Sequence, residues 1–169
     1  MFTIEQTYTL AGLTALCRAG RKTVRGPARI PRLILWAIFL VLAVLVAVSL
    51  SLGLSPGVLA YVVLVAIPIL LLTEDRLNAW IAQRQLLPGS AHSVTVFTPD
   101  SYTVTTDTTE TIYQYENITQ LCETQRYFIF FLGKRHGQMF DKSCFQSGTA
   151  EAFRAFIEEK TGLLFRTVK

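Results

Sequence analysis

The sequence predicts an α+β protein with membrane helices: a two-helix transmembrane hairpin, then a small antiparallel β module closed by a C-terminal amphipathic helix. Two observations predict this class. No charged residue lies between Arg32 and Glu74, and a Ser-Pro-Gly break at residues 55–57 divides this stretch into two apolar runs. An uncharged apolar run of roughly 18 residues or more is typical of a membrane-spanning helix. After residue 90, short alternating segments separated by turns are typical of strands.

Turns and composition divide the chain into three predicted segments. Pro88-Gly89-Ser90 separates the apolar part from the alternating part, whose composition is that of an ordinary soluble protein. The segments are an N-terminal strand and basic helix at residues 1–30, the transmembrane hairpin at residues 31–82 and the β module at residues 90–169.

The N-terminal segment predicts a short strand followed by a basic helix. Phe2, Ile4 and Tyr8 lie at even spacing among polar residues, as in a half-buried strand. From Leu10 to about Val24, apolar residues recur near helical spacing, opposite much of the basic set. Two arrangements of this helix fit equally well. It lies on an anionic leaflet, gaining roughly 1 kcal/mol per basic residue near the surface, or it packs on the β module with its charges in solvent.

The two apolar runs predict helices that enter and leave the membrane on one side. The first extends from about Leu33 to Leu54, and the second from Val58 to Leu72 with continuation toward Trp80. Their connection has no Lys or Arg, whereas the flanks carry Arg18, Arg21, Lys22, Arg25, Arg29, Arg32, Arg76 and Arg84. The positive-inside rule therefore places both termini in the cytoplasm and the turn outside.

The remaining residues predict an antiparallel meander that ends in a helix. Tyr127 to Leu132 is apolar throughout, as in a central strand, and residues 133–137 read as the tip of the next hairpin. Phe153, Phe156 and Ile157 then give one apolar helical face, and Gly162 is a natural C-terminal cap.

No catalytic constellation is evident in the sequence. The two histidines, His92 and His136, lie far apart and lack metal-ligand spacing. A nucleophilic Cys122 or Cys144 paired with His136 is conceivable, but nothing local supports it. No ionisable residue occurs within the apolar runs, where ion and proton pathways usually need one. We therefore predict no enzymatic activity, no cofactor and no metal.

Several segments together resemble the bacterial YcxB-like membrane proteins. These are the Tyr-Thr-Leu run near the N-terminus, the Ile-Tyr-Gln-Tyr-Glu-Asn-Ile run at residues 112–118, the apolar strand at 127–131 and the closing helix around residues 153–157. Tyr115 stands where the family usually has Trp, before Ile118, and Phe145 ends a Lys-containing stretch that lacks the family's proline. The resemblance implies a pleckstrin-homology (PH)-like module and a bacterial cytoplasmic (inner) membrane location, and it brings no catalytic residues.

The predicted role is that of a membrane anchor whose cytoplasmic module binds the anionic leaflet or a protein partner. Membrane lipids are the expected partners, a further copy of the chain is another possibility, and nucleic acid is not expected. An accessory subunit of a membrane enzyme or of an oligomeric transporter is the alternative. Basic residues are the candidate lipid- or partner-binding positions, namely Arg21, Lys22, Arg25, Lys134, Arg135 and Lys142, with Arg126 beside the last three.

Overall fold

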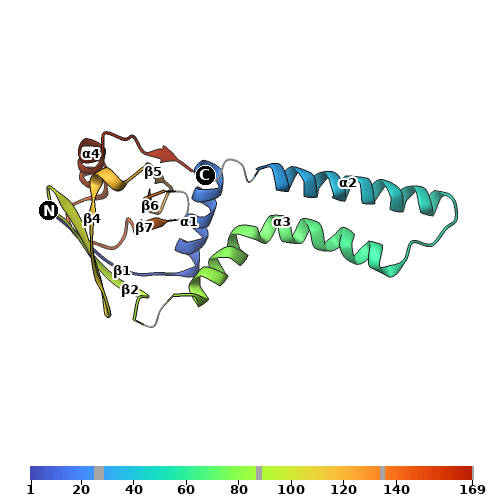
Figure 1. Cartoon of the computed structure of the whole chain (residues 1–169), viewed down its shortest axis with the longest axis horizontal. Coiled ribbons are helices and arrows are strands. Elements are labelled where there is room, and N and C mark those ends of the chain that lie inside the picture. The colour runs from blue at the N-terminus through green and yellow to red at the C-terminus, as the bar shows by residue number, and fades with distance from the viewer. Residues whose placement is uncertain (25–28, 87–88, 134–135, 169) are drawn as a thin grey trace.

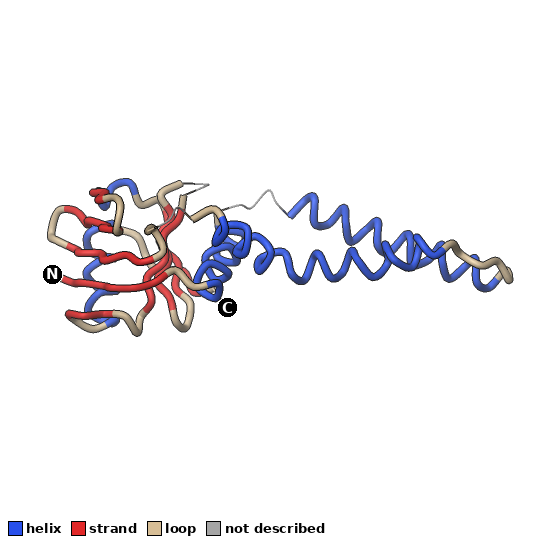
Figure 2. Tube along the Cα trace, turned by 90° about the horizontal axis from the view of Figure 1, so that it is seen from below, coloured by secondary structure: helices blue, strands red, loops and turns tan. Residues whose placement is uncertain are grey.

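A computed structural model describes residues 1–24, 29–86, 89–133 and 136–168. The molecule is elongated, with an α+β module at one end and a helical hairpin projecting from it (Figures 1 and 2). The described helices are α1 (Leu10–Thr23), α2 (Arg29–Ser51), α3 (Val58–Arg84) and α4 (Ala150–Thr161). The described strands are β1 (Phe2–Thr7), β2 (His92–Phe97), β3 (Ser101–Thr106), β4 (Glu110–Gln114), β5 (Gln120–Glu123), β6 (Tyr127–Phe131), β7 (Gly137–Asp141), β8 (Phe145–Ser147) and β9 (Arg166–Thr167).

The hairpin consists of two helices that are long and apolar enough to cross a membrane. These stretches are Ile30–Ser51 and Val58–Arg84. Only 6% and 11% of the residues in their apolar 18-residue segments are buried within the molecule. The predicted apolar runs are therefore helical, and α3 continues past Trp80. Pro31 lies in the first turn of α2, where its missing N–H costs no helical hydrogen bond.

The described strands form two sheets rather than one continuous meander. One sheet has the order β4-β3-β2-β1-β8 and the other β7-β6-β5-β9. The chain passes between them through a 3-10 turn at Tyr115–Asn117, which the alternation of residue types could not predict. Neighbours pair antiparallel, as expected, except that the two-residue strand β9 runs parallel to β5.

The N-terminal strand is an interior strand of the module. β1 pairs with β2 from Phe2↔Phe97 to Thr7↔His92, and on its other side with β8. The module therefore combines residues from before and after the hairpin, and the hairpin is an insertion between α1 and β2. Because both ends of the hairpin connect to one folded unit, the start of α2 and the end of α3 lie at the same end of the hairpin, next to the module.

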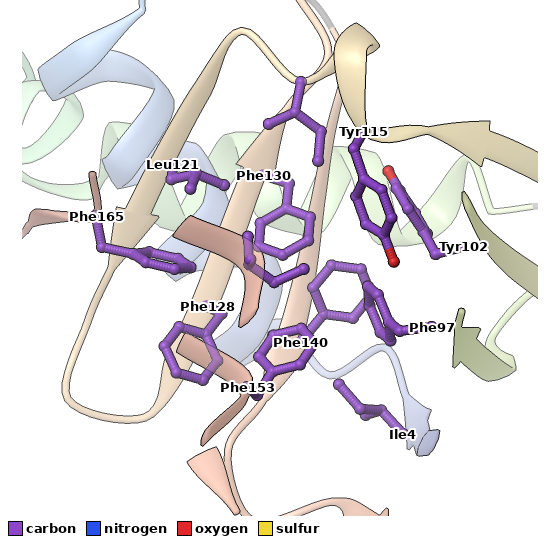
Figure 3. Packing of buried hydrophobic residues seen from close by; sticks show 12 residues of the cluster. Ile4, Phe97, Tyr102, Tyr115, Leu121, Phe128, Phe130, Phe140, Phe153 and Phe165 are labelled. Atoms are coloured by element: carbon purple, nitrogen blue, oxygen red, sulfur yellow. The ribbon is translucent and has the colours of Figure 1, made fainter. Parts of the chain in front are cut away.

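An aromatic core joins the two sheets and α4 (Figure 3). Phe97 and Phe153 are fully buried and meet edge to face with 4.7 Å between ring centroids. All residues of β6 are buried, so the predicted central strand is confirmed. Helix α4 is capped at its N-terminus by Thr149, whose side chain accepts a hydrogen bond from Ala152 N. At its C-terminus it is capped by Gly162 with φ 67°, as the sequence indicated.

Candidate functional site

Helix α1 lies between the β7-β6-β5-β9 sheet and α3. Of the two arrangements that its basic amphipathic pattern allowed, on the leaflet or on the module, the structure has the second. Ala19 is fully buried in a cluster with Ile129 and Met139 of the sheet. Gly12 permits the close approach, because a Cβ there would lie 2.3 Å from the Met139 terminal methyl carbon. The helix packs on the module, and its charges are not simply solvated.

An ion pair between Arg21 and Asp75 ties α1 to α3. Arg21 donates from Nε to Asp75 Oδ1 at 2.8 Å and from a terminal nitrogen to Oδ2 at 2.5 Å. Arg18 adds a longer contact, with its Nε 3.8 Å from Asp75 Oδ2. The hydrogen bonds to Asp75 raise the pKa of Arg21, which is only 23% exposed. Such a two-bond guanidinium–carboxylate contact fixes orientation as well as distance.

A groove of about 720 Å³ opens on the module beside α1. Its walls come from α1, the β5–β6 turn, the residue after β7 and the C-terminal residues around β9. The lining residues are Ala15, Arg18, Glu123, Thr124, Gln125, Arg126, Tyr127, Lys142, Thr167 and Val168. Three of these side chains are cationic and one is anionic, so the groove carries a net positive charge.

Arg126 is held at the groove through a single edge of its guanidinium group. Its Nε donates to Asp141 Oδ2 at 2.9 Å, while the side chain stays 63% exposed. Asp141 is in turn fixed by Ser143, whose N and Oγ donate to Oδ1 at 2.9 and 2.7 Å. Burial opposes ionisation of Asp141, but the bonds from Ser143 and Arg126 outweigh it, and the pKa of Asp141 is lowered. The carboxylate therefore positions Arg126.

Lys142, which neighbours Arg126 in the groove, is held from two sides. Its Nζ donates to Glu123 Oε1 and lies 4.7 Å from the centre of the Phe128 ring. The Lys142 amide also donates to Arg126 O at 2.9 Å, so the two cationic residues are joined through the backbone. Both cations thus have defined positions in the structure.

The residues predicted as binding positions do not gather in one place. Arg21 is used in the α1–α3 contact, and Lys142 lines the groove. Lys22 is exposed on α1. Arg25, Lys134 and Arg135 lie outside the described residues. No signal in the sequence indicated that Arg18 and Asp75 would meet, because all of α2 lies between them along the chain.

The residues considered for catalysis are dispersed. Cys122 is buried and its pKa is raised by that burial, which a weak Thr23 contact only partly offsets. His92 and Glu5 lie together in the sheet that does not contain Cys122, with 3.2 Å between His92 Nε2 and Glu5 Oε1. The exposed His136 stacks on Tyr113. Among the described residues, no three His, Cys, Asp or Glu side chains are grouped to hold a metal ion.

Part of the module matches a known protein family. Residues 97–157 match the model of the YcxB-like protein family. This segment, which is less than half of the chain, is similar to the YcxB-like proteins. No curated protein and no solved structure matches the chain. The part that matches the YcxB-like model holds Arg126, Asp141 and Lys142, whereas α1 and the hairpin lie outside it.

The positions that carry the YcxB-like resemblance lie in or against the aromatic core. Tyr115 and Ile118 are buried, and Phe145 packs against the same cluster. The Tyr115 hydroxyl donates to Thr98 O at 2.7 Å and to Ser101 O at 3.2 Å. These contacts hold the turn between the two sheets, so Tyr115 has a packing role that its place in the 3-10 turn explains.

Proposed function

We propose that this chain is a double-spanning protein of the bacterial cytoplasmic membrane whose α+β module binds anionic headgroups at the inner leaflet. The exposed apolar surface of α2 and α3 supports membrane insertion. Leu33, Val44 and Leu72, for example, are 67%, 61% and 75% exposed. A soluble monomer rarely leaves a continuous apolar surface of this extent in water.

Charge and topology favour one orientation. Both flanks of the hairpin carry Lys and Arg, and the connection at residues 52–57 carries none. Because β1 and β2 pair within one sheet, both flanks occupy the same compartment. The module and both termini are therefore cytoplasmic in this proposal. Strands followed by one closing helix also favour a PH-like fold for the module.

The observation that carries the proposal is the position of α1 between the sheet and α3. Arg21 and Asp75 fix the module on the hairpin rather than leaving it on a flexible tether. Arg18 contacts Asp75 and lines the groove, so the groove lies beside the point where α3 leaves its apolar part. We infer a module that presents a basic binding groove to the membrane surface and has no catalytic role.

Site-directed labelling in cells tests this proposal. In a variant whose native cysteines are replaced by alanine, Ser55→Cys and Gln146→Cys are made separately; both positions are exposed. A membrane-impermeant maleimide should label Ser55→Cys in intact spheroplasts, and Gln146→Cys only after permeabilisation. Labelling of both sites in intact spheroplasts, or release of the chain by alkaline carbonate, would contradict the proposal.

A further inference from the structure

We propose that the groove beside α1 is a binding site for the phosphodiester group of an anionic phospholipid, with Arg126 as the principal ligand and Arg18 and Lys142 as supporting cations. This inference rests on the proposed function and names the ligand class and the residues of its binding site. It draws on residues that come from four parts of the fold and converge on one depression.

The geometry of Arg126 suits recognition of a phosphate oxygen. Its Nε is occupied by Asp141, and the 63% exposed side chain presents the terminal guanidinium nitrogens at the groove. A guanidinium group binds phosphate through parallel N–H donors, which a point charge cannot do. Because Asp141 and its Ser143 contacts already hold Arg126, little side-chain freedom is lost on binding.

The charges of the groove favour an anion over a neutral headgroup. Arg18, Arg126 and Lys142 line it with Glu123 as the single lining acid, and each cation contacts a carboxylate: Asp75, Asp141 and Glu123 in turn. Arg18 and Arg126 nevertheless stay 50% and 63% exposed, so they keep N–H donors available to an anion. A net negative headgroup therefore meets complementary charge. A zwitterionic headgroup would bring its own cation toward Arg126 and Lys142, which disfavours it.

Size and position favour a lipid over a free ion. About 720 Å³ lies within the range of small-molecule sites, roughly 300–1,000 Å³, and is far larger than one phosphate needs. Ala15, Tyr127 and Val168 supply apolar surface for the glycerol part. Arg18 joins the groove to Asp75 of α3, and so to the level at which the inserted hairpin would meet the headgroups.

Native mass spectrometry of the full chain in neutral detergent tests the site. The probes are dioctanoyl phosphatidylglycerol, dioctanoyl phosphatidylcholine and inorganic phosphate. Phosphatidylglycerol should bind with an apparent affinity about tenfold higher than the other two, because the choline cation of phosphatidylcholine is repelled by Arg126 and Lys142, and inorganic phosphate lacks a glycerol part to contact Ala15, Tyr127 and Val168. Equal binding of phosphatidylcholine, or equal binding of inorganic phosphate, would overturn the proposal.

Variants assign the binding to the groove. Arg126→Gln should weaken phosphatidylglycerol binding by roughly tenfold or more, and Arg126→Lys by less, because it keeps the charge and loses the paired donors. Arg166→Gln is the matched control, since Arg166 is exposed on β9 and lines a different depression. Unchanged binding by Arg126→Gln, or an equal loss with Arg166→Gln, would overturn the assignment.

Two further measurements keep the result interpretable. If thermal unfolding shows that Arg126→Gln does not fold, Lys142→Gln provides a second test. Lys142→Gln should also weaken phosphatidylglycerol binding. Binding by Lys142→Gln at the wild-type level would contradict the site. Carbonate resistance of the same variants reports anchoring separately. A chain that stays in the membrane but does not bind phosphatidylglycerol would overturn this inference and leave the anchoring intact.

Discussion

Arg21 of α1 and Asp75 of α3 form a two-bond ion pair, with 2.8 Å between Nε and Oδ1, although the whole of α2 separates them in the sequence. The pair joins the folded module to the base of the apolar hairpin. Arg18 approaches the same carboxylate from one turn earlier on α1. A single acidic residue thus connects the hairpin to the helix that packs on the sheet.

Replacing Asp75 should loosen the module from the hairpin. Asp75→Ala leaves the mostly buried Arg21 without its partner, so we expect the free energy of unfolding to fall by roughly 1–3 kcal/mol. Thermal unfolding of the full chain in detergent measures the change. Glu74→Gln is the control on the same helix and should cost less.

A charge exchange separates the pair itself from other effects of these residues. The double variant Arg21→Asp with Asp75→Arg should recover part of the stability that either single change loses. If the two losses simply add, the ion pair does not join α1 to α3 energetically.

Two glycines with positive φ should respond differently to alanine. Gly148 has φ 83°, and a Cβ there would lie 2.4 Å from the Phe2 ring, whereas Gly162 has φ 67° and open space. Gly162→Ala should cost about 1 kcal/mol from backbone strain alone. Gly148→Ala should cost roughly 1–3 kcal/mol more, because the Phe2 ring must move. Chemical denaturation measures both, and equal costs would refute the close contact.

Asp141 should make the module sensitive to acid. Its pKa in the folded chain lies below that of an unfolded Asp, so its stabilising contribution is complete above about pH 4 and is lost as the pH falls through the lowered value. Unfolding midpoints between about pH 6 and pH 2 should therefore drop more steeply for the wild type than for Asp141→Asn. Parallel curves would show that Ser143 and Arg126 do not stabilise the charged form.

Cys122 should be a poor nucleophile in the folded chain. Burial raises its pKa, so little thiolate is present at neutral pH. A thiol reagent should modify Cys144, which is partly exposed, well before Cys122, and unfolding in dodecyl sulfate should remove the difference. Mass mapping of the modified peptides measures the order; rapid native labelling of Cys122 would revive a reactive role for this thiol.

Local patterns predicted the parts of this fold that depend on local sequence. The charge-free stretch predicted the two apolar helices, and the apolar run at 127–132 predicted a buried strand. Gly162 predicted the end of α4 because its left-handed conformation is a local requirement. Such features need no knowledge of distant residues.

Long-range pairings could not be predicted in the same way. The even spacing of Phe2 and Ile4 indicates a strand, but nothing in it says that β1 lies between β2 and β8 across the hairpin. Likewise, Arg18 and Arg126 read as separate surface charges, and only the packing of α1 brings them to one groove. The candidate site depends on these contacts. The sequence could therefore predict that basic residues form it, but not which of them come together.

A distance measurement between the hairpin and the module tests the central claim most directly. Spin labels at Ser55→Cys and Gln146→Cys, in the cysteine-free chain reconstituted into liposomes, report whether α1 holds the two parts rigidly. We predict one narrow distance distribution, and a clearly broader one when Asp75→Ala is added. A distribution that is already broad without Asp75→Ala, and that this change leaves unaltered, would contradict a module fixed on its hairpin.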